Sequence, residues 1–147
     1  PEKLIPSTII KAILRKKIVV YGDGMQIRDW LYVDDHAEAL LKVAEYGKIG
    51  EKYNIGGSCE KTNIEVVNTI CNILSKKYPL KNESISSYND LITFTSDRPG
   101  HDFRYAINST KIKEEFDWSP RESFETGIEK TINWYLENKD WWIHLIK

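Results

Sequence analysis

The chain has 147 residues, of which 41% are hydrophobic and 29% are charged, and this usage is ordinary for a globular protein with one core. A formal net charge of −1 argues against a nucleic-acid partner or an anionic membrane partner, because neither would be attracted electrostatically. No apolar stretch approaches the roughly 18 to 20 residues of a membrane-spanning helix, so we expect no membrane partner and no nucleic-acid partner.

Hydrophobic periodicity and turn residues predict an alternation of helices and strands. In chain order we expect a helix over 4–15, strands over 18–21 and 26–33, a helix over 35–46, a strand over 52–55, a helix from 62 to beyond 74, and a loop over 79–90 in which one helical turn stays open. Strands over 92–95 and 103–107, a short helix ending near 118, a helix over 122–138 and a short terminal helix that includes 141–142 are expected to follow. The alternation favours an α/β or α+β arrangement. The strands are few and short, so we interpret several of them as additions to a sheet that lies elsewhere.

Polar residues at the predicted helix starts indicate N-caps. Asp34 and Asp35 are expected to cap the second helix, and Thr62 and Glu65 have the spacing of a capping box. Asn108 is expected to cap the short helix that follows the last strand. The inward face of the second helix is expected to consist of Ala37, Leu40, Leu41 and Ala44.

The cysteine pattern favours a cytoplasmic protein without a metal site. Cys59 and Cys71 form no CxxC motif, and no histidine stands at metal-ligand spacing from them. Reduced thiols are the ordinary state of cysteines in the cytoplasm. We therefore predict two free thiols and no bound metal.

Two motifs that suggest dinucleotide chemistry are interpreted as structural. The Gly22-x-Gly24 turn lacks a third glycine, because Ile27 stands in its place, and a strand rather than a helix is expected to follow. Tyr135 and Lys139 satisfy Tyr-x-x-x-Lys, but they lie at the end of an amphipathic helix with the tyrosine on its apolar face. An acid/base pair formed by Asp34 and Asp35 is a further alternative, but helix capping explains their position better.

Arg28 and Arg98 are candidates for binding an anion. Arg28 lies on a predicted strand with apolar neighbours such as Ile27 and Trp30, where a long cation rarely occurs without a partner. Arg98 lies on a turn-rich loop, and guanidinium groups suit phosphate oxygens. Convergence on one diphosphate and salt bridges to neighbouring aspartates are both compatible with this pattern. Tyr21, at the end of a strand, offers its ring either to a flat base or to the core.

Several segments together resemble the dTDP-glucose 4,6-dehydratase family of the extended short-chain dehydrogenase/reductase superfamily. They are Lys3–Pro6, Val20–His36, Tyr53–Gly57, Asp97–Asp102 with Arg104–Ile107, and Trp134–Tyr135. The Asp-Arg-Pro-Gly-His-Asp segment is particular to the dehydratases, whereas the others are shared more loosely among sugar-nucleotide enzymes of the superfamily.

The resemblance covers only the C-terminal substrate-binding part of the family, and the chain begins at Pro1 without an initiator Met. It therefore implies an α/β fold with mixed helices and short strands, in which the Rossmann core is missing. Residues 1–147 are expected to be a nucleotide-sugar-binding C-terminal domain without catalytic or cofactor-binding residues of its own. NAD would be bound by the missing N-terminal domain, and this chain alone would be inactive.

The activity implied by the resemblance is that of a lyase in nucleotide-sugar metabolism. The full-length enzyme, expected to be a homodimer, would convert dTDP-glucose to dTDP-4-keto-6-deoxy-glucose plus water for deoxysugar biosynthesis. Two alternatives stay open: another sugar-nucleotide epimerase or decarboxylase of the same superfamily, or a non-catalytic or inactive fragment. The helix over 35–46 would normally pack on the Rossmann sheet, so we expect exposed apolar surface and low stability or association in the isolated chain.

The resemblance also implies a binding site for the dTDP moiety. Its residues are Lys3, Leu4, Ile5, Pro6, Ser7 and Thr8 along the nucleotide, Val19, Val20 and Tyr21 around the thymine, Arg28 at the diphosphate, Asn63 as a polar contact, and Asp97, Arg98, Pro99, Gly100 and His101 over the diphosphate and sugar. Tyr21 would stack on the base and Arg98 would be the second cation. A purely structural role for Asn63 is equally open, because it lies beside the predicted cap.

Overall fold

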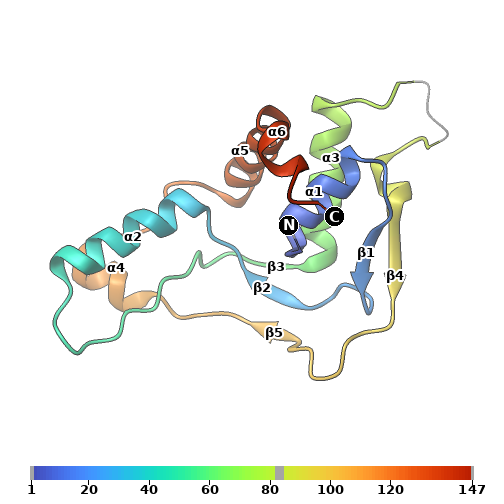
Figure 1. Cartoon of the computed structure of the whole chain (residues 1–147). Helices are drawn as coiled ribbons and strands as arrows, with labels where there is room; N and C mark the ends of the chain where they lie inside the picture. The colour runs from blue at the N-terminus through green and yellow to red at the C-terminus, as the bar shows by residue number, and fades with distance from the viewer. Residues whose placement is uncertain (1, 82–84, 147) are drawn as a thin grey trace. The chain divides into compact units, whose positions relative to one another are not determined.

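The structure is a computed structural model that describes residues 2–81 and 85–146 (Figure 1). In chain order its elements are α1 (Leu4–Ile13), β1 (Ile18–Tyr21), β2 (Ile27–Asp29), α2 (Val33–Tyr46), β3 (Glu60–Thr62), α3 (Asn63–Lys77), η1 (Tyr88–Leu91), β4 (Ile92–Thr95), β5 (Arg104–Tyr105), α4 (Thr110–Phe116), α5 (Phe124–Glu137) and α6 (Lys139–Ile143). The predicted mixture of helices and short strands is confirmed.

The chain forms two compact units. Unit 1 comprises Pro1–Gln26, Thr62–Asp102 and Glu129–Lys147, and unit 2 comprises Ile27–Lys61 and Phe103–Ile128. The assignment of residues 1–147 to one nucleotide-sugar-binding domain is not tested by this division and stays a prediction.

Unit 1 is built around the packing of α1 on α3 and of α1 on β1. Alternate residues of β1 face its core, so Ile18 and Val20 are buried. Strand β1 pairs in parallel with β4. The remaining buried hydrophobic residues of unit 1 are Ile9, Ile10, Ala12, Ile13, Val66, Val67, Ile70, Cys71, Leu74, Tyr88, Leu91, Ile132 and Trp142.

Helix α3 begins with the capping box that its sequence predicts. The Thr62 hydroxyl accepts a hydrogen bond from the Glu65 backbone N–H (3.3 Å), and the Glu65 carboxylate accepts one from the Thr62 backbone N–H (2.7 Å). These bonds satisfy two donors that the first turn of a helix otherwise leaves unpaired. The start of α3 is therefore fixed by local sequence.

Unit 2 is organised by the packing of α2 on α4 and by a small sheet with the strand order β3-β2-β5. Strand β2 pairs in parallel with β5, so that Arg28 lies opposite Tyr105. Ala39, Ile112 and Trp118 form the buried cluster of this unit. Leu31, Val43, Ile55 and Phe116 pack against the cluster and are partly buried.

The prediction that Asp34 and Asp35 cap α2 is wrong. Helix α2 starts earlier, at Val33, with Tyr32 in the N-cap position and no side-chain cap. Both aspartates lie in its first turn, where a negative charge still favours the helix dipole. Asp35 is buried, and its carboxylate accepts a hydrogen bond from the backbone N–H of Glu122 (3.0 Å), which offsets part of the cost of burying it.

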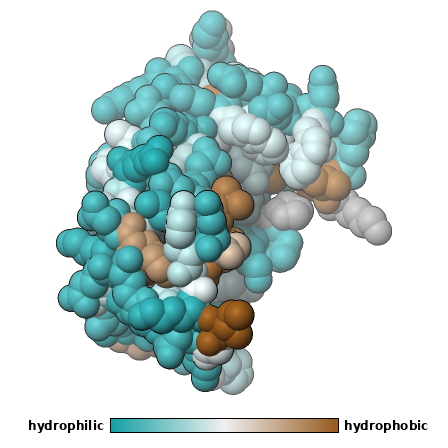
Figure 2. All heavy atoms as spheres, turned by 90° about the vertical axis from the view of Figure 1, so that its left-hand side faces the viewer, coloured by the Kyte–Doolittle hydropathy of each residue, from teal (hydrophilic) through white to brown (hydrophobic). Residues whose placement is uncertain are grey.

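The predicted inward face of α2 is also wrong. The buried residues of this helix are Asp35 and Ala39, whereas Leu40 and Leu41 are 52% and 70% exposed. Ala37 and Ala44 are exposed as well. Positions 35 and 39 lie one turn apart and therefore on the same face of α2. This is the face that is covered in unit 2, where Ala39 packs with Ile112 of α4 and with Trp118. The exposed apolar surface expected of the isolated chain is thus present, and Figure 2, which views the side on which α2 lies, shows hydrophobic patches on a hydrophilic surface.

Two strand and cap predictions in unit 2 are corrected. Residues 52–55 form no strand, and β3 lies later, at Glu60–Thr62. Ser109 rather than Asn108 takes the N-cap position of α4, while Asn108 accepts a hydrogen bond from the Thr110 backbone N–H (2.9 Å). The strands predicted over 26–33 and 103–107 are both shorter than expected.

The predicted loop over 79–90 contains the start of the short helix η1, and its residues 82–84 lie outside the described residues. None of the helices in the described ranges is long and apolar enough to cross a membrane.

Candidate functional site

The strand β1 places Tyr21 on the surface of unit 1. Alternation along the strand buries Val20, which is 1% exposed, and turns Val19 and Tyr21 outward with 40% and 51% exposure. Of the two interpretations of Tyr21, the core position is therefore excluded. Its ring is available to a flat ligand, whereas Val20 has only its backbone to offer at this surface.

The Gly22–Gly24 turn holds Tyr21 next to two other segments of unit 1. The backbone N–H of Gly22 donates to the Thr95 carbonyl oxygen (2.9 Å), and the Gly24 carbonyl oxygen accepts from the Ile64 N–H (3.0 Å). Tyr21 itself lies opposite Thr95 in the β1–β4 register. The turn therefore connects the end of β1 to the end of β4 and to the start of α3.

This turn does not fit a dinucleotide pyrophosphate. Gly22 and Gly24 have positive φ angles of 59° and 76°, and the chain then enters β2 rather than a helix. A Cβ at Gly24 would lie 2.9 Å from Ile64 Cβ and from Val20 Cγ1, so side chains already fill the space beside it. The glycines serve a tight turn and close packing.

The Asp97–His101 segment is ordered around one carboxylate. Asp97 Oδ1 accepts a hydrogen bond from the Arg98 backbone N–H (2.8 Å) and lies 2.6 Å from His101 Nδ1. The other oxygen, Oδ2, accepts a hydrogen bond from Gln26 Nε2 (2.8 Å). The contact with His101 is the main cause that lowers the pKa of Asp97 below its ordinary value. This carboxylate is therefore held in its ionised form.

Arg98 is the exposed cation of this segment. Asp97 accepts a hydrogen bond from the backbone N–H of Arg98, and the Arg98 guanidinium has no ion-pair partner within 4.0 Å among residues 2–81 and 85–146. The His101 side chain, in contrast, is only 6% exposed. Gly100 has a positive φ of 69° with open space where its Cβ would be. The loop thus fixes its histidine and leaves its arginine available to an anion.

Asn63 and the Lys3–Thr8 segment lie at helix starts in unit 1. The backbone N–H of Asn63, the first residue of α3, donates to the Gln26 carbonyl oxygen (3.0 Å), which supports its structural role. Lys3 is the N-cap residue of α1 and is exposed. Thr8 is 2% exposed and faces the core. The Thr8 side chain could therefore touch a nucleotide only if it left the core. The role of the Lys3–Thr8 segment stays a prediction.

Arg28 belongs to unit 2, on strand β2. It is partly buried, and its Nη1 donates to the Ile27 carbonyl oxygen (2.6 Å). The neighbouring Asp29 accepts hydrogen bonds from the backbone N–H groups of Gly57 (2.9 Å) and Cys59 (2.7 Å). The predicted convergence of Arg28 with Arg98 on one diphosphate stays a prediction.

Gln26 was not predicted from the sequence as part of this site. It is 5% exposed and bonds to Asp97, 71 residues away in the chain. A polar side chain at the start of the strand predicted over 26–33 was the available signal, and the same signal singled out Arg28 two residues later. A buried side-chain amide costs free energy because it is removed from water, so such a residue usually forms hydrogen bonds that the structure needs.

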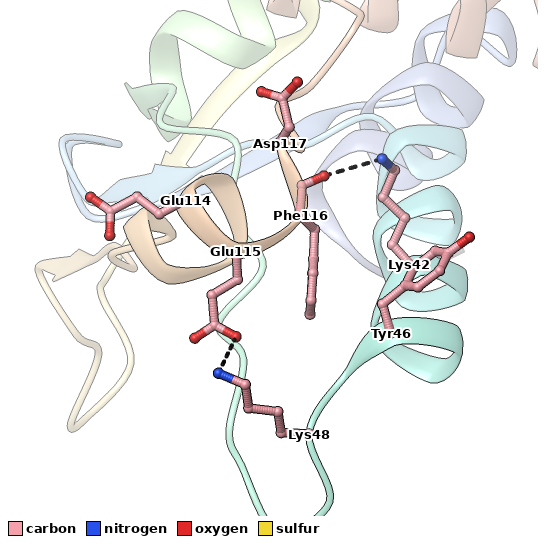
Figure 3. A pocket seen from close by; sticks show the side chains of 7 residues that line it. All are labelled: Lys42, Tyr46, Lys48, Glu114, Glu115, Phe116 and Asp117. Carbon is pink, nitrogen blue, oxygen red and sulfur yellow. Dashed lines mark hydrogen bonds and ion pairs between the residues drawn. The ribbon is translucent and has the colours of Figure 1, made fainter.

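An open hollow of about 510 Å³ lies in unit 2, and none of the predicted site residues lines it (Figure 3). It is lined by Lys42, Tyr46, Lys48, Glu114, Glu115, Phe116 and Asp117. Two of its cations are engaged by neighbours, because Lys42 donates to the Phe116 carbonyl oxygen (3.3 Å) and Lys48 lies 3.6 Å from Glu115. Because both lysines and acidic residues line the hollow, its charge favours no class of ligand, and we assign it no function.

Comparison with known proteins identifies relatives over nearly the whole chain. The sequence pattern of the family described as GDP-mannose 4,6 dehydratase matches residues 1–131. The dTDP-glucose 4,6-dehydratase of Neisseria meningitidis serogroup B is 56% identical over 146 residues, which make up 99% of this chain and 41% of that protein.

Two solved dehydratase structures have the same fold as this chain. The dTDP-glucose 4,6-dehydratase of Bacillus anthracis, solved in complex with NAD, has a TM-score of 0.85 and 46% identity. The dTDP-glucose 4,6-dehydratase of Streptomyces venezuelae, solved with NAD and TYD bound, has a TM-score of 0.87 and 34% identity. Each match covers 99% of this chain and 42% of the solved chain. The chain thus spans about two fifths of the length of the relatives that it matches.

Proposed function

The chain belongs to the family described as GDP-mannose 4,6 dehydratase, and from this membership we propose that it is the dTDP-binding part of an NAD-dependent dTDP-glucose 4,6-dehydratase. The whole protein would convert dTDP-glucose to dTDP-4-keto-6-deoxy-glucose plus water. The 56% identity to the Neisseria dehydratase supports this choice of reaction within the family.

The observation that carries the proposal is the arrangement at the ends of β1 and β4. The exposed ring of Tyr21 lies opposite Thr95, two residues before the ordered loop that presents Arg98. A ring for a base and a guanidinium for a phosphate are the two groups that a nucleoside diphosphate needs. Base–aromatic stacking contributes roughly 1 to 3 kcal/mol, and a charge-assisted hydrogen bond contributes roughly 1.5 to 3 kcal/mol.

Each site residue has a role in this proposal. Tyr21 stacks on the thymine, Arg98 binds the diphosphate, and Arg28 is the second diphosphate ligand. Asp97 and His101 hold the loop in position. The remaining proposed contacts are Lys3, Leu4, Ile5, Pro6, Ser7, Thr8, Val19, Val20, Asn63, Pro99 and Gly100.

NAD and the catalytic groups would lie in a part of the whole protein outside this chain. The Gly22–Gly24 turn does not fit a dinucleotide, and the Bacillus anthracis relative was solved in complex with NAD. The contribution of this chain is to hold the sugar in place through its nucleotide. Binding energy from a remote part of a substrate favours reaction when it orients the reacting part.

The proposal extends to the setting of the whole protein. We place it in the cytoplasm as a homodimer, without a nucleic-acid or membrane partner. The formal net charge of −1 supports the absence of polyanionic partners.

The test measures binding of dTDP and UDP to the purified chain by isothermal titration calorimetry. We expect dTDP to bind and to compete more strongly than UDP. Substituting Arg98→Ala is expected to weaken dTDP binding by about 10- to 100-fold, and Arg98→Lys by less, because lysine keeps the charge but loses the planar fork.

The matched control is Arg121→Ala, which removes the same side chain from an exposed site in unit 2. Its dTDP affinity should equal that of the unchanged chain. With added NAD and dTDP-glucose, the chain should show no turnover. Equal binding of UDP would favour an epimerase or decarboxylase of the same superfamily, and absence of all nucleotide binding would favour an inert fragment.

A further inference from the structure

We propose that Gln26 is a positioning residue that sets the geometry of the Asp97–His101 loop for nucleotide binding. The inference rests on the proposed function, because the loop geometry matters only if the loop binds the nucleotide. Gln26 is 5% exposed and lies just after the glycine turn that follows Tyr21. Its role would be to act through Asp97 rather than to touch the ligand.

The side chain of Gln26 fixes one oxygen of Asp97. Its Nε2 donates to Asp97 Oδ2 (2.8 Å), while Asp97 Oδ1 accepts from the Arg98 N–H and contacts His101. The orientation of the amide is settled by chemistry, because an ionised carboxylate can only accept hydrogen bonds. With both oxygens engaged, the plane of the carboxylate is fixed, and so are the backbone of Arg98 and the ring of His101.

The backbone of Gln26 connects this loop to a third segment. Its carbonyl oxygen accepts from the Asn63 N–H (3.0 Å) at the start of α3. A Cβ at Gly22 would lie 3.1 Å from Gln26 Nε2 and 3.2 Å from Asp97 Oδ2, so the pair packs directly against the turn. One residue therefore relates the segments that carry Tyr21, Asn63 and Asp97, all of which belong to unit 1.

The amide oxygen of Gln26 indicates that this residue is not explained by stability alone. Gln26 Oε1 is buried and has no hydrogen-bond partner within the described parts of the chain. A buried amide oxygen without a partner is costly, and an apolar side chain of similar length would avoid that cost. The Nε2 donor is the part of the side chain that this site uses.

The physical consequence is a loop that is ordered before the ligand arrives. Binding to a preorganised site avoids the entropy cost of ordering the loop, whereas a loosened loop loses affinity without losing any direct contact. We expect loss of the Gln26–Asp97 bond to weaken dTDP binding by about tenfold, the effect of one hydrogen bond to a charged group.

The test uses three variants of the chain and dTDP as the probe. Gln26→Leu removes the donor and the unpartnered oxygen together. Gln26→Glu keeps the shape but places a second carboxylate against Asp97. The double variant Gln26→Glu with Asp97→Asn reverses the polarity of the pair, because the new amide donates to the new carboxylate while its oxygen still accepts from the Arg98 N–H.

The expected result is weaker dTDP binding by Gln26→Leu, still weaker binding by Gln26→Glu, and recovery in the double variant. Backbone amide NMR shifts of Arg98 and His101 should move in the single variants and return in the double variant. Asn68→Ala is the control, because it breaks an amide hydrogen bond of the same 2.8 Å length, from Asn89, elsewhere in unit 1. It should lower the thermal midpoint without changing dTDP affinity.

The outcomes separate the inference from the function on which it rests. If the unchanged chain binds dTDP and Gln26→Leu binds equally well, the inference is overturned and the proposed function stands. If Gln26→Leu does not fold, the isosteric Gln26→Glu decides, and failure of the double variant to recover affinity overturns the inference. If the unchanged chain does not bind dTDP at all, both proposals fail together.

Discussion

Unit 1 and unit 2 differ in how much apolar surface each buries. Among the buried hydrophobic residues in the described parts of the chain, only Ala39, Ile112, Trp118 and Ile128 lie in unit 2, and all the others lie in unit 1. Burial of an aliphatic side chain contributes roughly 1.5 to 3 kcal/mol. Unit 1 therefore has the larger share of the stabilisation that comes from removing apolar surface from water.

Unit 2 is held together mainly by polar contacts between segments that are distant in the sequence. Asp29 accepts from two backbone N–H groups, and Asp35 accepts from a third. Ion pairs join Arg104 to Glu60, Lys111 to Glu51 and Arg121 to Glu38. Because most of these groups are exposed, they contribute less than buried apolar contacts and are weakened by salt.

Unit 1 is thus the part of the chain with the larger apolar core, and unit 2 is the part that relies more on exposed polar contacts. Most of the proposed site residues belong to unit 1, where packed elements hold them, while unit 2 carries Arg28 and the exposed apolar face of α2. Each unit contains one cysteine, Cys71 in unit 1 and Cys59 in unit 2. The two thiols therefore report separately on the opening of each unit.

The largest expected effect is loss of a core side chain from unit 1. Ile9 is fully buried on α1, which packs on α3, so Ile9→Ala should destabilise unit 1 by about 2 to 5 kcal/mol. Burial raises the pKa of the Cys71 thiol to about 12, so this thiol is protected while α3 is packed. Native-state thiol labelling should show Cys71 reacting more than about tenfold faster in the variant.

The matched control for this variant is Ile112→Ala, which makes a similar truncation in the core of unit 2. It should accelerate labelling of Cys59 and leave Cys71 protected. Equal acceleration of both thiols by either variant would show that the two units open together, and the comparison would then describe packing but not stability.

A smaller effect is expected from removing the main polar tie of unit 2. Asp29→Ala leaves the N–H groups of Gly57 and Cys59 without their acceptor, at a cost of about 2 to 3 kcal/mol. Hydrogen exchange of these two amides and labelling of Cys59 should both become faster. Asp29→Asn, which keeps one acceptor oxygen, should lie between the variant and the unchanged chain.

Labelling of Cys71 should not respond to Asp29→Ala. A slower or unchanged exchange at Gly57 would mean that the loop is held by its glycine packing instead, since a Cβ at Gly57 would clash with the Trp30 carbonyl oxygen. In that case unit 2 would depend on close backbone contact and less on its polar ties.

Local signals in the sequence were enough to predict the elements of unit 1. The capping box at Thr62 and the aliphatic spacing of α1 act within one or two turns, and the observed helices follow them. The inward face of α2 depended on which neighbour covers it, and the α4 side covers the line through Ala39. Periodicity indicates an apolar face, but it cannot say whether that face is covered.

The candidate site was predictable only in part, for a related reason. Tyr21 and Arg98 were singled out by strand end, loop position and family resemblance, and unit 1 places them on segments that meet. Gln26 was missed because its partner lies 71 residues away, and no local pattern encodes that contact. The absent strand over 52–55 was likewise a β-prone run without a partner strand.

The smallest expected effect concerns the exposed ion pair of unit 2. Arg104 donates to both carboxylate oxygens of Glu60, and this contact is the main cause that lowers the pKa of Glu60 below its ordinary value of 4.5. A carboxyl group whose pKa is lowered by folding stabilises the fold above its unfolded-state pKa and loses that contribution as the pH falls through the folded-state pKa. The contribution should therefore be complete at neutral pH, begin to decline as the pH falls toward 4.5, and be lost once the pH is below the lowered folded-state pKa.

Glu60→Gln should remove this pH dependence with little change in the midpoint of unfolding at neutral pH, because exposed pairs contribute little. In about 0.5 M salt the unchanged chain and the variant should have the same stability, because salt screens the attraction between exposed charges. The comparison of Cys59 labelling between pH 7 and pH 4, with and without the substitution, measures the difference. A large loss of stability that persists in high salt would show that the carboxylate does more than pair with Arg104, and that the polar ties of unit 2 are stronger than their exposure implies.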